Sequence, residues 1–251
     1  MLWVFDLDGV IWLGGEPIAG SAAAVDRIRR AGHRVAFVTN NSGPTRSEYV
    51  KMLAGAGVEA AEAELVTSAQ AGASLFAMAE RVAVVGGDGV LEALADRGVT
   101  VVEPDDDPAG VIVGRTLDLD HDRLAAAATA IRGGARFVAT NTDPTFPTAS
   151  GLLPGAGALA AFVATASGAN PEVAGKPHRP VADLVRDRFG PVDVMVGDRP
   201  DTDGLFAAMI HARFALVLSG VTPRAEIPAD PAPDLVGADL AAITDQILGP
   251  R

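Results

Sequence analysis

The chain has 251 residues, 49% of them hydrophobic, with no cysteine and a net charge of −12. The acidic balance disfavours nucleic acids and anionic membranes as partners, because both bind basic surfaces. The absence of cysteine excludes disulfides and thiolate metal sites. No apolar run is long enough to cross a membrane. We therefore expect a globular cytoplasmic protein without a secretory signal.

The first strand predicted from the sequence ends in two acidic residues. Residues 2–5 form an apolar run, and Asp6 and Asp8 follow it one residue apart, just before Gly9. Two carboxylates in so small a volume repel one another, so that one takes up a proton or both bind a cation. The alternative reading is a strand end with two solvated acids.

A helix over 21–31 and a strand over 34–39 complete a predicted β-α-β unit. Its right-handed crossover places both strand ends at one edge of the sheet, so Thr39, Asn40 and Asn41 would face the two acids. A hydroxyl and two amides suit an oxyanion. An ordinary asparagine-rich turn is the alternative.

Residues 79–174 repeat the alternation of strands and helices, which predicts a second α/β domain inserted between residues 1–78 and 175–251. Its strands are expected at 82–87, 99–102, 110–114 and 136–139, and its helices at 89–97, 120–132 and 158–167. The segment 140–148, which contains two prolines, is predicted to be a long polar turn.

The last third of the chain adds a lysine and two more acids. Lys176 lies between a glycine and a proline, a strand over 193–198 ends in Asp198, and a helix is predicted to open at 201–204, which includes Asp203. Carboxylates, small polar groups and one lysine at a sheet edge are typical of an oxygen-only cation site, and Mg²⁺ fits best. A carboxylate and a phosphate about 4 Å apart repel by roughly 4 kcal/mol at an effective dielectric of about 20, which Mg²⁺ and Lys176 would reverse.

These segments resemble the four motifs of the haloacid dehalogenase (HAD) superfamily: Asp6 to Val10, the strand end at 39–42, Lys176, and Gly197 to Asp203. A narrower resemblance, to the NagD-like, para-nitrophenyl phosphatase branch, is found in segments 38–42, 139–148, 151–155 and 219–222. One departure is that Pro200, Asp201 and Gly204 stand where the branch usually has larger apolar residues.

The resemblance implies an α/β fold, with a Rossmann-like parallel-sheet core and an inserted smaller α/β cap. It also implies a Mg²⁺-dependent phosphomonoesterase acting on a small phosphorylated metabolite. Asp6 would be the nucleophile and Asp8 the general acid and base. The resemblance also implies that the phosphate is bound by Thr39, Asn40, Asn41 and Lys176. The implied metal ligands are Asp6, Asp8 (through its backbone carbonyl), Asp198 and Asp203, with Asp203 and Asp201 orienting the ligands. The cap residues implied to contact the leaving group are Asp143, Thr145 and Phe146.

Other functions stay open from the sequence alone. Phosphoryl transfer to another acceptor, as in a phosphomutase, and a non-catalytic module that binds a phosphorylated ligand are the alternatives. Dehalogenation is disfavoured, because it needs no acid two residues after the nucleophile. The branch includes enzymes for sugar phosphates, nucleotides, glycerol phosphate and phosphoglycolate, and its caps often pair, so a homodimer is one option.

Overall fold

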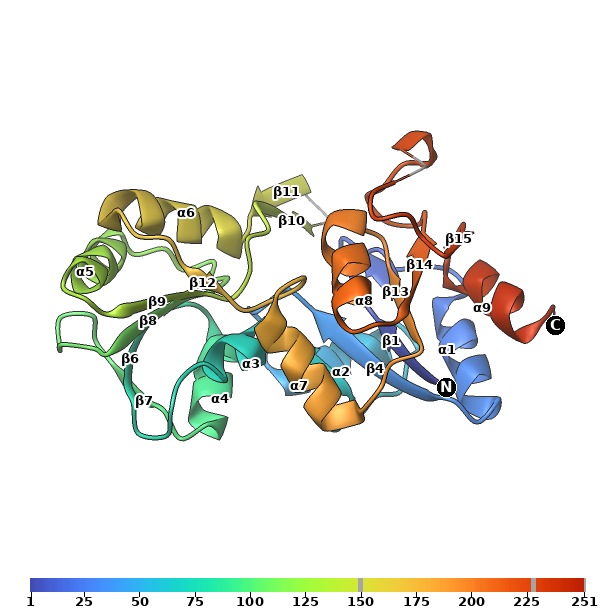
Figure 1. Ribbon diagram of the computed structural model, residues 1–251, viewed down its shortest axis with the longest axis horizontal. Coiled ribbons are helices and arrows are strands. Elements are labelled where there is room, and N and C mark those ends of the chain that lie inside the picture. Colours follow the sequence, from blue (N-terminus) through green and yellow to red (C-terminus); the bar gives the residue numbers. More distant parts are fainter. Residues whose placement is uncertain (149–150, 227–228, 251) are drawn as a thin grey trace.

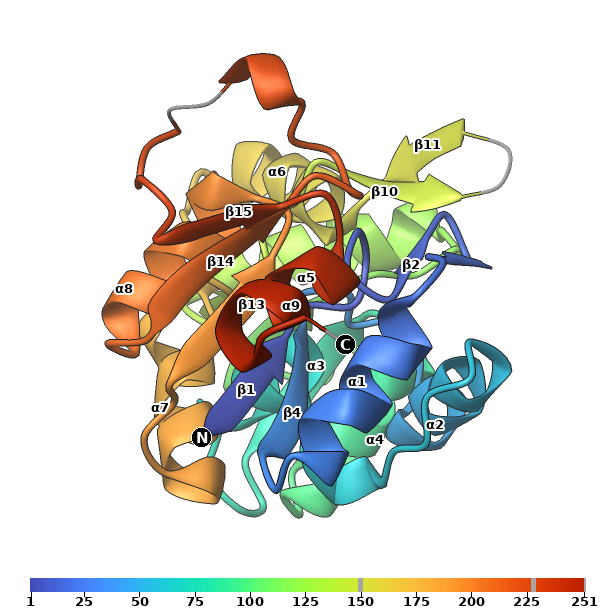
Figure 2. The same cartoon turned by 90° about the vertical axis from the view of Figure 1, so that its right-hand side faces the viewer.

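The computed structural model describes residues 1–148, 151–226 and 229–250. Its first sheet has six parallel strands in the order β15-β14-β13-β1-β4-β5 (Figure 2). The strands are β1 (Leu2–Phe5), β4 (Arg34–Thr39), β5 (Leu65–Thr67), β13 (Val194–Gly197), β14 (Arg213–Val217) and β15 (Leu235–Gly237). The two strands predicted to carry most of the site, β1 and β13, are neighbours in the sheet.

Helices cover both faces of this core sheet, as parallel strands joined by helical crossovers require. One face buries apolar side chains of α1 (Ser21–Arg30), α2 (Arg46–Gly55) and α9 (Leu240–Leu248). The opposite face packs against α3 (Ser68–Ala73), α7 (Arg179–Phe189) and α8 (Leu205–Met209). Each crossover returns the chain to the edge of the sheet at which the strands begin, so the carboxyl ends of all six strands lie at the opposite edge.

A second sheet of five parallel strands, in the order β12-β9-β8-β6-β7, forms a separate lobe (Figure 1). Its strands are β6 (Arg81–Val85), β7 (Thr100–Val102), β8 (Gly110–Val113), β9 (Arg136–Ala139) and β12 (Glu172–Val173). Helices α5 (His121–Arg132) and α6 (Ala156–Ser167) pack on one face, and α4 (Asp88–Asp96) packs on the other with α3. The predicted fold class, a parallel-sheet core with a smaller α/β cap, is confirmed.

The two lobes share buried apolar contacts. Helix α3 connects them, and one continuous apolar cluster runs from Val38 and Val66 of the core to Val82 and Ile112 of the cap. The strands of the second sheet run from Arg81 to Val173, while the predicted domain limits after residues 78 and 174 stay a prediction.

Some local predictions were wrong. The expected polar turn at 140–148 contains β10 (Thr145–Thr148), which pairs antiparallel with β11 (Gly151–Pro154). The helix expected to open at 201–204 begins instead as a π-helical turn (Pro200–Gly204) before α8. A small hairpin, β2 (Trp12–Leu13) with β3 (Glu16–Pro17), follows the first acids, and the 3-10 turns Glu62–Glu64 and Arg224–Glu226 complete the described elements. Within the described residues, none of the helices combines the length and apolar character that a membrane span requires.

Candidate active site

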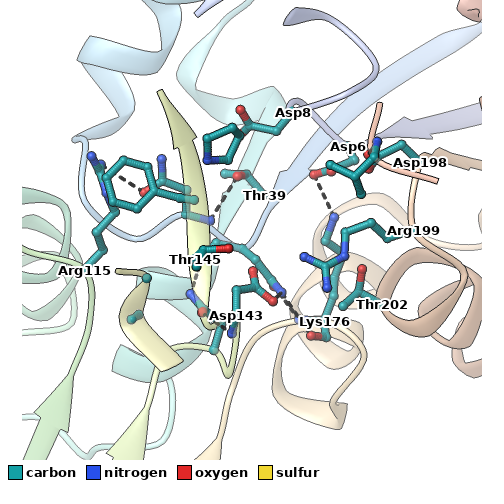
Figure 3. A pocket seen from close by; sticks show the side chains of 18 of the residues that line it. Asp6, Asp8, Thr39, Arg115, Asp143, Thr145, Lys176, Asp198, Arg199 and Thr202 are labelled. Atoms are coloured by element: carbon teal, nitrogen blue, oxygen red, sulfur yellow. Dashed lines mark hydrogen bonds and ion pairs between the residues drawn. The ribbon is translucent and has the colours of Figure 1, made fainter. Parts of the chain in front are cut away.

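The carboxyl ends of three neighbouring core strands bring the predicted site residues together. Asp6 directly follows β1, Asp198 directly follows β13, and Thr39 ends β4. These residues, together with Asp8 and Lys176, line a pocket between the core and the cap (Figure 3).

Three buried acids cluster beside Lys176: Asp6 and Asp198 line the pocket, and Asp203 is fully buried next to them. Carboxylate oxygens of Asp6, Asp198 and Asp203 all lie within 4.8 Å of one another. Lys176 Nζ donates to Asp6 Oδ1 and to Asp203 Oδ1, both at 2.7 Å. Burial, followed by repulsion from Asp203, raises the pKa of Asp198 to about 7, and burial also raises the pKa of Asp6. The site therefore holds more buried negative charge than Lys176 compensates, and its all-oxygen donor set fits a hard divalent cation such as Mg²⁺.

Asp203 is fully engaged by the protein. Its Oδ2 accepts the backbone N–H groups of Asp198 and Arg199 at 3.1 Å each, and its Oδ1 accepts from Lys176. The π-helical turn brings the residue back under Asp198, with the N–H of Asp203 bonded to the carbonyl of Arg199 at 2.7 Å. We infer that Asp203 positions Asp198 and Lys176. Asp201, in contrast, is exposed and pairs with Arg199 at 3.2 Å.

Glycines allow the backbone to approach Asp198 closely. A Cβ at Gly220 would lie 2.0 Å from Asp198 Oδ2, and one at Gly9 would lie 2.5 Å from the same atom. Gly9 also has a φ of +82°, which disfavours any other residue. The space left by Gly220 lets the N–H of Val221 donate to Asp198 Oδ2 at 2.7 Å. One oxygen of Asp198 is thus fixed by the backbone, which orients the other toward the acid cluster.

Asp8 lies beyond the turn, and its carboxylate is not part of the buried trio. Burial raises the pKa of Asp8 to about 6, against a hydrogen bond from Trp12 and the charges of Lys176 and Arg115, which lower it. Trp12 is itself buried. A carboxyl group with a pKa near neutrality can both donate and accept a proton, which suits general acid-base chemistry.

The polar residues after β4 mostly hold the site in shape. Asn40 Oδ1 accepts the N–H of Lys176 at 2.7 Å, and Asn40 Nδ2 donates to the carbonyl of Lys176 at 3.1 Å and to Asp143 Oδ1 at 3.3 Å. Thr39 Oγ1 accepts the N–H of Asn41 at 3.1 Å. All three line the pocket, as predicted, but their role in phosphate binding stays a prediction.

Both predicted and unpredicted residues line the pocket where the cap meets the core. Asp143, Thr145 and Phe146 all line it, and Asp143 contacts the core through Asn40. Sequence reasoning missed Arg115 and Arg199, which line it too. The guanidinium of Arg115 lies 3.7 Å from the centre of the Phe146 ring. The position of Arg115 just past the end of β8 could have indicated a site residue, because ligand-binding residues favour the carboxyl ends of parallel strands.

Comparison with known proteins agrees with this geometry. Residues 3–100 match the model of the haloacid dehalogenase-like hydrolases, and residues 173–243 match a second model described as HAD-hydrolase-like. An acid sugar phosphatase from Staphylococcus haemolyticus is 35% identical over 231 residues, which span 90% of this chain and 88% of that protein.

Solved structures are similar over almost the whole chain. A glycerol phosphate phosphatase from Mycobacterium tuberculosis, determined in complex with magnesium, superposes with a TM-score of 0.90 at 35% identity, covering 96% of this chain and 75% of that one. NagD from E. coli superposes with a TM-score of 0.86 at 30% identity, covering 95% and 96%. The fold and the acid site define a hydrolase of the haloacid dehalogenase class. The chain belongs to this family, and its resemblance to NagD and the para-nitrophenyl phosphatases is confirmed.

Proposed function

We propose that the protein is a Mg²⁺-dependent phosphomonoesterase that hydrolyses a small phosphorylated metabolite through an aspartyl-phosphate on Asp6. The observation that carries the proposal is the ion pair of Asp6 and Lys176, 2.7 Å apart, inside a cluster of buried acids beside the pocket. An anionic nucleophile beside a fixed cation is the arrangement that covalent phosphoryl transfer to a carboxylate needs. The acid sugar and glycerol phosphate phosphatases among the relatives support the same reaction class.

In the first step an Asp6 oxygen attacks phosphorus, and the bond from phosphorus to the ester oxygen breaks. Asp8, protonated, gives its proton to the departing oxygen, which leaves as an alcohol. In the second step Asp8, now a carboxylate, takes a proton from water as the water oxygen attacks phosphorus. The acyl phosphate then breaks to release inorganic phosphate and restore Asp6. The pKa of about 6 at Asp8 suits both halves of this cycle.

The residues available to hold Mg²⁺ are Asp6, Asp198 and the backbone carbonyl of Asp8, with Asp203 as their positioning residue. When bound, Mg²⁺ supplies positive charge that offsets the repulsion between the acids and a phosphate. Lys176 supplies the fixed part of that charge, and it is held by Asp203 on one side and by Asn40 along its backbone. Thr39, Asn40 and Asn41 complete the proposed phosphate site.

The cap excludes water from the first step. Asn40 joins Lys176 of the core to Asp143 of the cap, so the two lobes are in contact beside the pocket. Asp143, Thr145 and Phe146 line the pocket, which supports their proposed contact with the leaving group. A cytoplasmic location and a homodimer belong to the same proposal. A phosphomutase remains the second candidate, since it would use the same first step.

Phosphate release tests the proposal. The protein is incubated with para-nitrophenyl phosphate and a panel of sugar phosphates, nucleotides, glycerol phosphate and phosphoglycolate, in Mg²⁺ or in EDTA. Release that requires Mg²⁺ and is abolished by Asp6→Asn supports it. Release unaffected by Asp6→Asn overturns the role of Asp6, and absence of release from every ester overturns the phosphatase.

A further inference from the structure

The cap brings Arg115 into the active-site pocket, and none of the carboxylates in the described part of the chain pairs with it. Arg115 follows β8 and is half-buried where the pocket is lined by Asp8, Asn41 and Phe146 (Figure 3). We propose that Arg115 binds a second anionic group, a carboxylate on the leaving group, so that the preferred substrates are phosphorylated small acids. The inference rests on the proposed phosphatase function and goes beyond it by naming the substrate class.

The guanidinium is held in place from two sides. Its plane contacts the Phe146 ring at 3.7 Å, and Nη1 donates to Asn41 Oδ1 at 3.3 Å. The backbone N–H of Arg115 also donates to Ser42 Oγ at 2.9 Å, which ties the end of β8 to the loop after β4. A guanidinium fixed in this way loses little conformational entropy when it binds a ligand.

The charge of Arg115 is not neutralised. Across residues 1–148, 151–226 and 229–250, no carboxylate comes within 4.0 Å of its nitrogens, and its Nε is buried without a hydrogen-bond partner. Burial lowers the pKa of Arg115, and the nearby Tyr49 and Asp8 oppose this effect without forming an ion pair with it. An anion that accepts from the remaining N–H groups would supply that charge.

The other cations that line the pocket, Lys176 and Arg199, already have carboxylate partners. Lys176 bridges Asp6 and Asp203, and Arg199 pairs with Asp201. Asp143 accepts from Asn40, and the charge of Arg199 lowers its pKa against the effect of burial. Arg115 is therefore the pocket cation, on the cap side, that can still pair with an anion of the ligand.

The position of Arg115 fits the leaving group. Arg115 and Asp8, the proposed acid for the ester oxygen, both line the main pocket and a second, adjoining hollow that includes Trp12 and Tyr49. The charge of Arg115 is also felt at Asp8. An ester oxygen protonated by Asp8 thus lies within the electrostatic reach of Arg115, which favours a leaving group of few carbon atoms that ends in a carboxylate.

The N-terminus of α6 adds to the positive character of the cap wall. Gly155 and Ala156 line the pocket, and the first turn of this 12-residue helix has no acidic residue and no side-chain cap. The positive end of the helix dipole therefore faces the pocket, beside Asp143.

Two pairs of substrates that differ only in the anion test the proposal. Phosphoglycolate is compared with 2-hydroxyethyl phosphate, and 3-phosphoglycerate with glycerol 3-phosphate, by kcat/KM in Mg²⁺. The natural protein should prefer at least one acid over its alcohol by roughly 10- to 100-fold, the range for a charge-assisted hydrogen-bonded pair. Arg115→Gln should remove this preference by lowering kcat/KM far more for the acid than for the alcohol, chiefly through a higher KM for the acid, and Arg115→Lys should restore part of it.

Arg199→Gln is the matched control, because it removes the other arginine of the pocket. Preservation of the acid preference in Arg199→Gln, together with its loss in Arg115→Gln, supports the assignment. Equal use of acid and alcohol by the natural protein, a parallel loss for both in Arg115→Gln, or loss of the preference in Arg199→Gln instead would overturn it. Hydrolysis of both members of a pair at equal efficiency leaves the phosphatase function intact, so the two proposals fail separately.

Discussion

Lys176 Nζ lies 2.7 Å from Asp203 Oδ1, and both side chains are buried, with 2% and 0% of their surface exposed. Because Asp203 also accepts the N–H groups of Asp198 and Arg199, one carboxylate fixes both the cation of the site and the backbone of a proposed metal ligand. The rigidity of the site thus depends on a residue that does not line the pocket. This relationship leads to the first prediction.

Lys176→Met should destabilise the metal-free protein strongly. The substitution leaves Asp6 and Asp203 buried without their shared cation, and removal of one partner of a buried ion pair costs about 3–5 kcal/mol. Denaturant unfolding in EDTA measures the change. The control is Arg179→Met, which breaks the exposed pair with Asp183 and should cost less than about 1 kcal/mol. Equal losses in the two variants would contradict the account.

Asp8→Asn should separate esters by their leaving groups. An alkoxide leaves poorly without a proton, so cleavage of glycerol phosphate should fall by about 10²–10⁴-fold. The para-nitrophenolate ion leaves without one, so the variant should still release a burst of para-nitrophenol and then turn over slowly, because water is not activated. Rapid-quench kinetics on both esters checks this. A similar loss of the first step for both would rule out Asp8 as the acid.

The stability of the metal-free protein should fall as pH rises. Burial and nearby acids raise the pKa of Asp198 to about 7 in the folded chain, against 3.8 for the ordinary group, so the folded state binds more protons between these values. Each unit of difference corresponds to about 1.4 kcal/mol of stability lost across the window, and no further loss from this group occurs above pH 7. Melting temperatures in EDTA should therefore decline as the pH rises from 3.8 to about 7.

Mg²⁺ should oppose that decline, because it binds the ionised acids and only the folded chain presents them together. Asp198→Asn should show both a weaker pH dependence in EDTA and a smaller stabilisation by Mg²⁺. If Mg²⁺ stabilises Asp198→Asn as much as the natural protein, Asp198 does not hold the metal.

Gly89→Ala should disturb the contact between the lobes. A Cβ there would lie 2.3 Å from the carbonyl oxygen of Pro44 and 2.7 Å from that of Ser42, so α4 would have to move away from the loop after β4. We expect KM to rise and kcat to fall, with helix content unchanged by circular dichroism. Gly55→Ala is the control, since nothing lies within 4 Å of the new Cβ, and it should leave activity intact while adding about 0.4–1 kcal/mol of stability.

The main features of the site followed from the sequence because they depend on strand order alone. Asp6, Thr39 and Asp198 each end a strand, and in a parallel sheet those ends must meet. The resemblance already implied that Asp203 orients the metal ligands. Its particular contacts, to Lys176 and to the N–H group of Asp198, did not follow from the sequence, because they depend on a π-helical turn at Pro200–Gly204.

The cap was harder to predict than the core. Pro147 suggested a turn, yet it lies in β10, because a two-stranded hairpin leaves outward positions where a missing N–H has no effect. Arg115 was overlooked because its distance in sequence from Phe146 and Asn41 gives no hint that it contacts both. Such contacts depend on how the cap sheet packs on the core, which no local pattern records.

The covalent intermediate is the central claim, and mass spectrometry tests it most directly. Asp8→Asn is mixed with para-nitrophenyl phosphate in Mg²⁺, quenched in acid within the burst, and digested. The account predicts one phosphoryl group on the peptide that contains Asp6, and none when Asp6→Asn is added to the same variant. A burst of para-nitrophenol with Asp6 left unmodified, or with the phosphoryl group on another residue, would contradict it.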